Sequence, residues 1–140
     1  MNCLFFFIFL ISFLLSQSPT LSFHLYFCWR FRVHIINNLS LKNLVIDCIS
    51  ADNDLGRHEL WWGEEFTFKI GQRPIGDTRV VCNVTKFGSN HITSINVFTN
   101  GFADDHCCKT RQCYWSARDD AIYFSNNNKN WNRWYNWTSV

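Results

Sequence analysis

The sequence predicts an all-β protein, a small antiparallel β-sandwich stabilised by disulfides. Short runs rich in β-branched and aromatic residues alternate with clusters of Asn, Asp, Gly and Ser. The turn signals recur about every 8–14 residues, a spacing typical of sandwiches. Six of the seven cysteines follow an apolar N-terminal run, which indicates an oxidising compartment in which cysteines pair.

Alternation of apolar and polar side chains identifies the strands. The clearest run is Glu65 to Ile70, which places Phe66, Phe68 and Ile70 on one face of a half-buried strand. Turn-forming residues separate such runs, and Gly56 is predicted to adopt a left-handed conformation. The predicted strands, in chain order, are residues 33–36, 44–49, 65–70, 79–84, 94–98, 113–117 and 121–124.

The N-terminus predicts secretion. Residues 3–15 are apolar and uncharged, and this run is shorter than the about 20 residues that a membrane-spanning helix needs. Small polar residues follow, so we interpret residues 1–22 as a signal peptide, cleaved after Ser18 or after Ser22. A buried N-terminal helix or strand is the alternative. Residues 23–140 then form a single domain, extracellular and without a membrane anchor.

Charge and sequons agree with an extracellular protein. The net charge is +2 and the basic residues are scattered along the sequence, so a nucleic-acid partner is not expected. Asn38, Asn83 and Asn136 each begin an Asn-x-Ser/Thr sequon and are candidate N-glycosylation sites. Asn83 lies in a predicted strand next to Cys82, so its use requires a side chain that faces solvent.

Four stretches together resemble a known family. Residues 33–39 resemble its V-x-I-x-N-x-L strand, and residues 48–56 resemble its C-x-S-x-D-x-D-L-G stretch. Residues 62–68 resemble a G-x-x-F-x-F strand, and residues 113–124 a closing C-x-W … D-G-I/F-Y region, with Ala121 where many relatives have Gly. In order and spacing, the chain from about residue 33 to 137 resembles the plant self-incompatibility proteins and their S-protein homologues.

The resemblance implies a β-sandwich with a short helix on one side, without enzymatic activity, cofactor or metal. It implies a secreted, monomeric signalling ligand that binds a cell-surface receptor protein, in pollen–pistil or other cell–cell recognition. Nothing in the residues themselves identifies the receptor.

The resemblance also bears on the disulfides. The family's four cysteines correspond to Cys48, Cys82, Cys107 and Cys113. Three connectivities are open, and we expect Cys48 to pair with Cys113 and Cys82 with Cys107. Two further cysteines, Cys28 and Cys108, then pair with each other or stay reactive and intermolecular.

Candidate catalytic residues do not form a pattern that an enzyme needs. Glu64 and Glu65 are adjacent, and neighbours on a strand point to opposite faces, so a solvated turn is favoured over a carboxylate pair. The same argument separates His58 from Glu59.

Metal sites are equally incomplete. His106, Cys107, Cys108 and Cys113 lack the second ligand pair of a structural zinc site. The acidic stretch from Asp47 to Asp54 lacks the downstream Glu of a calcium loop, and Asp52 and Asp54 are expected to cap backbone amides instead.

Two surfaces are candidates for binding. The polar segments Gly71 to Asp77 and Asn100 to Arg111 lie between strands, where binding loops commonly sit, and they are the expected receptor determinants. The adjacent Trp61 and Trp62 offer an alternative, a carbohydrate-binding or defence protein that stacks sugars on exposed rings.

Overall fold

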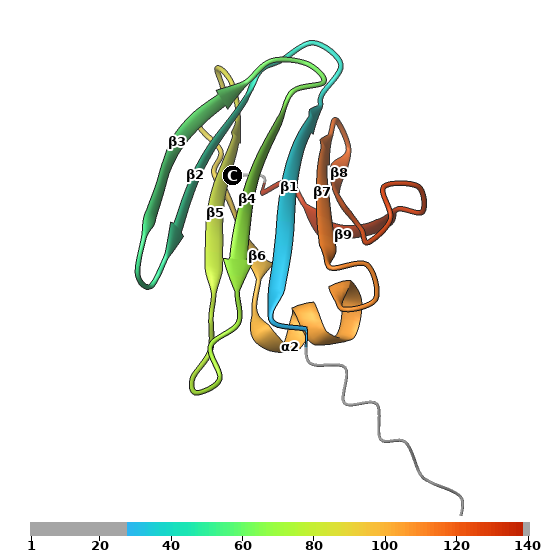
Figure 1. Ribbon diagram of the computed structural model, residues 1–140. Coiled ribbons are helices and arrows are strands. Elements are labelled where there is room, and N and C mark those ends of the chain that lie inside the picture. Colours follow the sequence, from blue (N-terminus) through green and yellow to red (C-terminus); the bar gives the residue numbers. More distant parts are fainter. Residues whose placement is uncertain (1–27, 139–140) are drawn as a thin grey trace, which may run out of the picture.

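Two β-sheets face each other across one apolar core in the computed structural model, which describes residues 28–138 (Figure 1). The predicted signal peptide, residues 1–22, lies outside the described residues. The first sheet has the order β4 (Glu65–Gly71), β1 (Arg30–Asn38), β7 (Gln112–Arg118), β8 (Ala121–Ser125), β9 (Asn132–Asn136). The second has the order β3 (Asp54–Leu60), β2 (Leu44–Ser50), β5 (Val80–Lys86), β6 (Thr93–Phe98). The sandwich and its disulfides confirm the predicted fold class.

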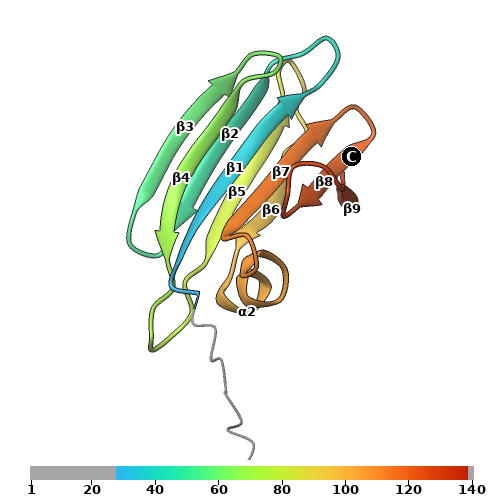
Figure 2. The ribbon, with the colours of Figure 1, turned by 45° about the vertical axis from the view of Figure 1, so that its right-hand side comes forward.

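One short helical segment joins the sheets, as the family resemblance implied. The turn α2 (Asn100–Phe102) continues into a π-helical turn η1 (Ala103–Cys107) between β6 and β7. Thr99 caps it, because its hydroxyl accepts a hydrogen bond from the Phe102 amide at 3.2 Å. Figure 2 shows this segment at one end of the sandwich, below β6 and β7.

The sheets are antiparallel except at one pair. β1 runs parallel to β7, with Val33 opposite Cys113 and Ile35 opposite Trp115. This pair is the exception to the predicted antiparallel arrangement, and it arises because the chain passes through the second sheet before it returns as β7. Parallel neighbours need such a crossover connection.

Alternating residues of both sheets fill the core. Val33, Ile35 and Trp115 are fully buried on the inner side of the first sheet, and Ile46 and Val84 face them from the second. The indole nitrogen of Trp115 donates a hydrogen bond to the Val97 carbonyl at 3.0 Å, so the largest buried side chain is also satisfied.

Two strands were not predicted, β3 and β9. The sequence assigns residues 54–56 to a turn, and it predicts no strand in the closing aromatic stretch that contains residues 132–136. Both are edge strands of their sheets. Edge strands carry polar side chains that weaken the alternating signal. Gly56 has φ +81°, as predicted, and its amide donates to Asp54 Oδ1 at 2.8 Å.

The structure explains why the V-x-I-x-N-x-L stretch contains an asparagine, Asn37. It is fully buried, and its side-chain amide donates to the carbonyls of Leu60 at 2.9 Å and Lys42 at 3.1 Å. Its Oδ1 accepts from the Leu39 amide at 2.9 Å. Asn37 therefore ties the end of β1 to the end of β3, where the chain crosses between sheets.

The disulfides correct the expected connectivity. The structure pairs Cys48 with Cys82 and Cys107 with Cys113, so the pairing of Cys48 with Cys113 and of Cys82 with Cys107 was wrong. Cys48 and Cys82 are directly opposite each other in the β2–β5 ladder, with Cα atoms 4.0 Å apart. That register is a tertiary property which cysteine spacing does not contain.

The sandwich has two distinct ends. Figure 1 places the β1–β2 and β3–β4 connections together at the upper end. The β4–β5 loop and the α2–η1 segment lie at the lower end. Within residues 28–138, no helix is long and apolar enough to cross a membrane.

Candidate functional site

The two predicted binding segments meet at the lower end of the sandwich. The β4–β5 loop follows Gly71 and the helical segment follows Phe98, the last residue of β6. Gln72 donates from its side chain to the Asn100 carbonyl at 3.3 Å and to Asp104 Oδ1 at 2.8 Å. We call residues 71–79 and 99–111 together the loop surface.

Asn100 connects the two halves of the loop surface. Its amide donates to Asp77 Oδ1 at 3.1 Å and its Nδ2 donates to the Gly76 carbonyl at 3.1 Å. Its Oδ1 accepts from the Thr78 amide at 3.1 Å. One side chain thus satisfies backbone groups of a loop more than 20 residues away. The β4–β5 loop is held as a defined structure by these bonds.

Aromatic packing fixes the α2–η1 segment, the helical part of the loop surface, to the core. The Phe102 ring lies between Trp115 and Phe124, at centroid distances of 5.5 Å and 4.9 Å, and touches Trp134 at 5.4 Å. His106 packs on Phe102 at 4.8 Å. Edge-to-face and offset contacts of this kind each stabilise by about 0.5–1.5 kcal/mol beyond burial. The segment is therefore anchored to the core by its inner face.

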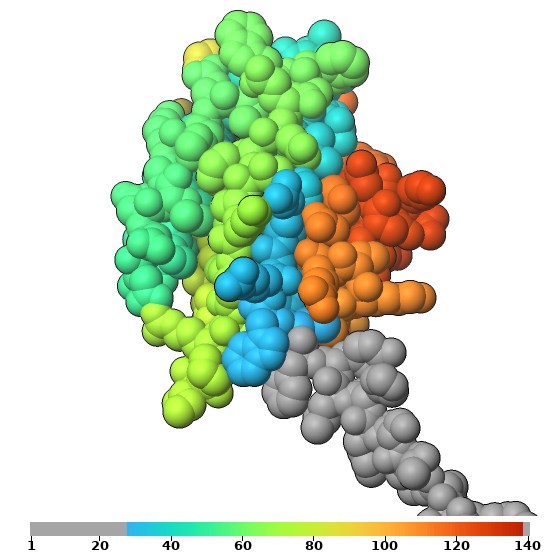
Figure 3. Space-filling view, viewed as in Figure 1, coloured from blue at the N-terminus to red at the C-terminus, as the bar shows by residue number. Residues whose placement is uncertain are grey.

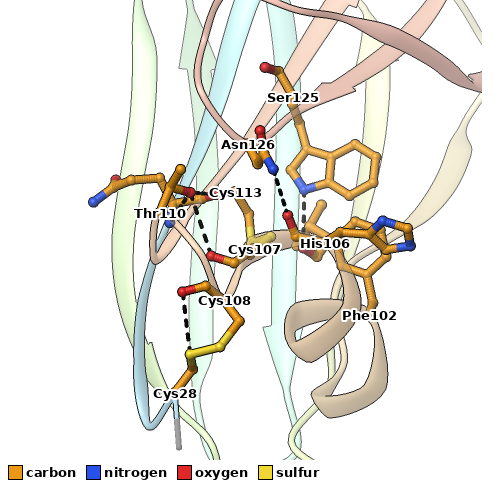
Figure 4. The surroundings of a disulfide bond; sticks show 12 residues. Cys28, Phe102, His106, Cys107, Cys108, Thr110, Cys113, Ser125 and Asn126 are labelled. Carbon is orange, nitrogen blue, oxygen red and sulfur yellow. Dashed lines mark hydrogen bonds between the residues drawn. A yellow bond between two sulfur atoms is a disulfide. The ribbon is translucent and has the colours of Figure 1, made fainter. Parts of the chain in front are cut away.

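Two disulfides leave the helical segment in different directions (Figure 4). Cys107 is fully buried and pairs with Cys113 at the start of β7, six residues on. Its neighbour Cys108 pairs with Cys28, just before β1. The alternative in which Cys28 and Cys108 pair with each other is the one that the structure shows. Together they clamp the α2–η1 segment to β7 and to the residues just before β1.

Several side chains of the loop surface point to solvent. Ile75 is 90% exposed at the tip of the β4–β5 loop. Asp104 and Asp105 are exposed on the helical segment. Arg73 forms an ion pair with Asp52, which adds the β2–β3 turn to the surface and replaces the backbone capping expected of Asp52. The result is a mixed polar and apolar surface held by a rigid frame, an arrangement suited to binding a partner.

The tryptophan pair lies at the opposite end. Trp61 and Trp62 form the β3–β4 turn and are 65% and 73% exposed. Glu64 accepts a hydrogen bond from the Trp61 amide at 2.9 Å, and Gly63 completes the turn with φ +77°. Both rings are thus available to a partner.

The predicted catalytic candidates do not converge. His58 stacks on Phe66 and contacts the Leu55 carbonyl, whereas Glu59 accepts from Asn43. Glu64 accepts the hydrogen bond from the Trp61 amide in the β3–β4 turn. In the described part of the chain no three potential metal ligands come together.

A contact that the sequence did not suggest joins His34 to Glu65. The imidazole Nδ1 lies 3.2 Å from Glu65 Oε2, and Nε2 lies 2.7 Å from Gln112 Oε1. His34 is 8% exposed and stacks on Tyr114 at 4.2 Å. Because both ring nitrogens already have partners, this contact reads as a structural one on the outer face of the first sheet.

The three sequons face solvent. Asn38, Asn83 and Asn136 are all exposed. The Asn83 side chain therefore faces solvent, as its glycosylation requires. Asn83 also lines a hollow of about 430 Å³ on the outer face of the second sheet, together with Phe87 and Ile92. Their glycosylation stays a prediction.

Fold and site together define a disulfide-bonded β-sandwich that carries a pre-organised loop surface at one end. Known proteins share this fold. The chain belongs to the family of plant self-incompatibility protein S1, which residues 32–137 match.

Similar proteins come from Arabidopsis thaliana. S-protein homolog 1 is 29% identical over 98 residues, which cover 69% of this chain and 64% of that protein. S-protein homolog 17 is 33% identical over 118 residues, covering 77% of this chain and 84% of the relative. S-protein homolog 29 is 31% identical and covers 75% and 76%, respectively.

A solved structure has the same fold. It represents SPH (self-incompatibility protein homologue) proteins, described as a widespread family of small, highly stable, secreted proteins from plants. The TM-score is 0.61 at 22% identity, over 80% of this chain and 97% of that one.

Proposed function

We propose that this chain is a secreted plant signalling ligand whose loop surface binds a cell-surface receptor protein. The observation that carries the proposal is the hydrogen bonding of Asn100 to Asp77, Gly76 and Thr78. It joins two loops distant in sequence into one preformed surface. A preformed surface loses less conformational entropy on binding than two independent loops.

Compartment and family support the same function. The related solved protein is described as secreted, and three disulfides among the described residues suit an oxidising environment. The protein acts by binding rather than by catalysis in this proposal, because the candidate acids and bases in residues 28–138 are engaged in separate structural contacts.

The test compares two exposed apolar residues at opposite ends. Ile75 is 90% exposed on the loop surface, and Leu41 is 93% exposed in the β1–β2 connection. The labelled protein is added to plasma-membrane vesicles of the plant that expresses it, and unlabelled protein competes. Ile75→Asp is expected to weaken specific binding at least tenfold, whereas Leu41→Asp leaves it unchanged. Equal binding by both variants and the wild type would remove the loop surface from the proposal.

A second candidate function rests on the tryptophan turn. Trp61 and Trp62 are adjacent and both mostly exposed, and such aromatic faces stack well on sugar rings. In this alternative the protein is a secreted carbohydrate-binding or defence protein. Binding on a glycan array that is lost in Trp61→Ala and Trp62→Ala would support it. An array without any bound glycan would exclude it.

A further inference from the structure

Four basic side chains that are scattered in the sequence gather on the outer face of the first sheet. Arg30 and Arg32 alternate along β1, Lys69 lies on β4, and Arg111 immediately precedes β7. They line one open hollow of about 500 Å³, together with Gly71. Figure 3 views the molecule from this side, with β4, β1 and β7 in front. We call this site the basic hollow.

Strand register explains the gathering. Arg30 is opposite Gly71 and Arg32 is opposite Lys69 in the β1–β4 ladder. Side chains of neighbouring strands on one face are about 5 Å apart, and alternate residues of one strand about 7 Å. Gly71 has no side chain beside Arg30, so a depression remains between the cations.

Among the described residues, no acid neutralises these cations. The described residues lining the basic hollow include no acid. The described ion pairs involve His34, Arg73, Arg79 and Arg133, and none of the four cations. Glu65, the acid on the same face of β4, is engaged by His34. Like charges directly opposite each other, such as Arg32 and Lys69, destabilise a sheet.

The backbone of Arg111 is held in an energetically unfavourable conformation. Its φ is +60°, a left-handed conformation that is unusual for a residue with a side chain. Its amide donates to the Cys107 carbonyl at 2.7 Å, and its carbonyl accepts from the Arg32 amide at 3.0 Å. The Cys107–Cys113 disulfide closes the turn around it. Two like charges opposite each other and a left-handed backbone therefore occur at the same place. Unfavourable features of this kind are found at functional sites.

We propose that the basic hollow binds an acidic polysaccharide, through carboxylates that recur along the sugar chain. Arginine forks bind carboxylates in a bidentate manner, and three of the four cations are arginines. For a protein outside the cell, the carboxylated polymers of the plant wall, the polyuronates, carry this chemistry. The open shape of the hollow suits a polymer that passes through it.

An acidic protein segment fits less well. The anchors of protein interfaces are aromatic side chains and arginines that fill closed, desolvated pockets. Of the described residues that line the basic hollow, only Phe31 is aromatic, and it is 3% exposed. This binding goes beyond the receptor proposal, because it concerns another partner and its test uses no membrane vesicles.

The test measures binding of the full secreted protein to immobilised polygalacturonate. Fully methyl-esterified polygalacturonate has the same backbone without charge, and polyglutamate carries carboxylates on a peptide. We expect binding to polygalacturonate at least tenfold tighter than to either, and weakened by 1 M salt as screening predicts. Tighter binding to polyglutamate would overturn the proposal in favour of an acidic protein, and equal binding to the ester would overturn it entirely.

Matched variants locate the site. Arg32→Ala with Arg111→Gly removes two charges from the basic hollow, and glycine accepts the left-handed backbone. Arg57→Ala with Lys129→Ala removes two charges elsewhere. The first pair is expected to weaken binding about tenfold or more, the second less than twofold. Lys69→Ala, a milder change, is expected to weaken it several-fold. Equal losses in both pairs would show a net-charge effect and overturn the assignment.

Discussion

The backbone amide of Asn100 donates a hydrogen bond to the Asp77 carboxylate at 3.1 Å, across 23 residues of sequence. The Asn100 side chain adds bonds to Gly76 and Thr78 in the same loop. Asn100 is the first residue of α2, and α2 is anchored to the core through Phe102. The β4–β5 loop therefore takes its shape from the helical segment.

Asn100→Ala is expected to lower the free energy of unfolding by roughly 1–3 kcal/mol, because two side-chain hydrogen bonds are lost and the Gly76 carbonyl and Thr78 amide lose their partners. Urea denaturation measures the change. Asn132→Ala, on the exposed side of β9 and without a side-chain hydrogen bond in the described residues, is the control and should change stability by less than about 0.5 kcal/mol. Similar values for both variants would contradict the role of Asn100.

The disulfide connectivity gives a second prediction. Peptide mapping without reduction should recover Cys48 linked to Cys82, and not to Cys113. The Cys48–Cys82 bridge closes a separation of 34 residues and the Cys107–Cys113 bridge only 6. On chain-entropy grounds, serine pairs at these positions should lower stability by about 4 and about 2 kcal/mol, respectively. A larger loss for the shorter loop would contradict this order.

The sequence predicted the strands that carry an apolar face, including the edge strands β4 and β6, and missed the edge strands β3 and β9. The run from Glu65 to Ile70 alternates strictly, so β4 was identified correctly, whereas Asp54 to Leu60 carries Arg57, His58 and Glu59, and no strand was predicted there. The buried face of a strand leaves a pattern in the sequence. An edge strand of mostly polar residues leaves no such pattern.

The candidate site was predictable only in part, because contacts between distant segments are not visible in the sequence. The polar segments after Gly71 and before Arg111 were identified by composition, but their contact depends on Asn100. The basic hollow was missed because Arg32, Lys69 and Arg111 are far apart in the chain and only strand register brings them together. The alternation of Arg30 and Arg32 along β1 was the one available signal.

Trp115→Phe is expected to lower the free energy of unfolding by roughly 2–4 kcal/mol. The change leaves a cavity at a fully buried position, and the Val97 carbonyl loses its 3.0 Å hydrogen bond. Thermal or urea unfolding followed by circular dichroism measures the difference. Trp62→Phe is the matched control, because Trp62 is 73% exposed, and its cost should be within about 0.5 kcal/mol. A small cost at Trp115 would contradict its place at the centre of the core.

N-glycosylation of Asn38, Asn83 and Asn136 is expected, because all three side chains are exposed. Enzymatic removal of N-glycans should reduce the intact mass of the secreted protein, and each Asn→Gln variant should lose one glycan. Asn90→Gln, exposed but outside any sequon, should lose none. An unchanged mass after enzymatic treatment of the wild type would contradict the prediction.

The last prediction concerns pH. The Tyr123 hydroxyl donates a 2.7 Å hydrogen bond to Asp120 Oδ2, at the β7–β8 turn. This bond lowers the pKa of Asp120 below its ordinary 3.8 and raises the pKa of Tyr123 above 10.0. A depressed carboxyl pKa contributes stability above the unfolded value, and that contribution is lost as the pH falls through the folded pKa. For Tyr123 the contribution is present below pH 10 and is lost as the pH rises through its folded pKa.

Tyr123→Phe should therefore move the pKa of Asp120 upward, as followed by carboxyl NMR titration. The shift will be partial, because Arg133 lies 3.8 Å from the same oxygen and continues to favour the charged form. Tyr114→Phe is the control, since its hydroxyl makes no hydrogen bond among the described residues and its ring stacks on His34 instead. An Asp120 pKa that is the same in the wild type and Tyr123→Phe would show that the hydrogen bond does not persist in solution. An equal upward shift in Tyr114→Phe would assign the effect to general loosening of the sheet.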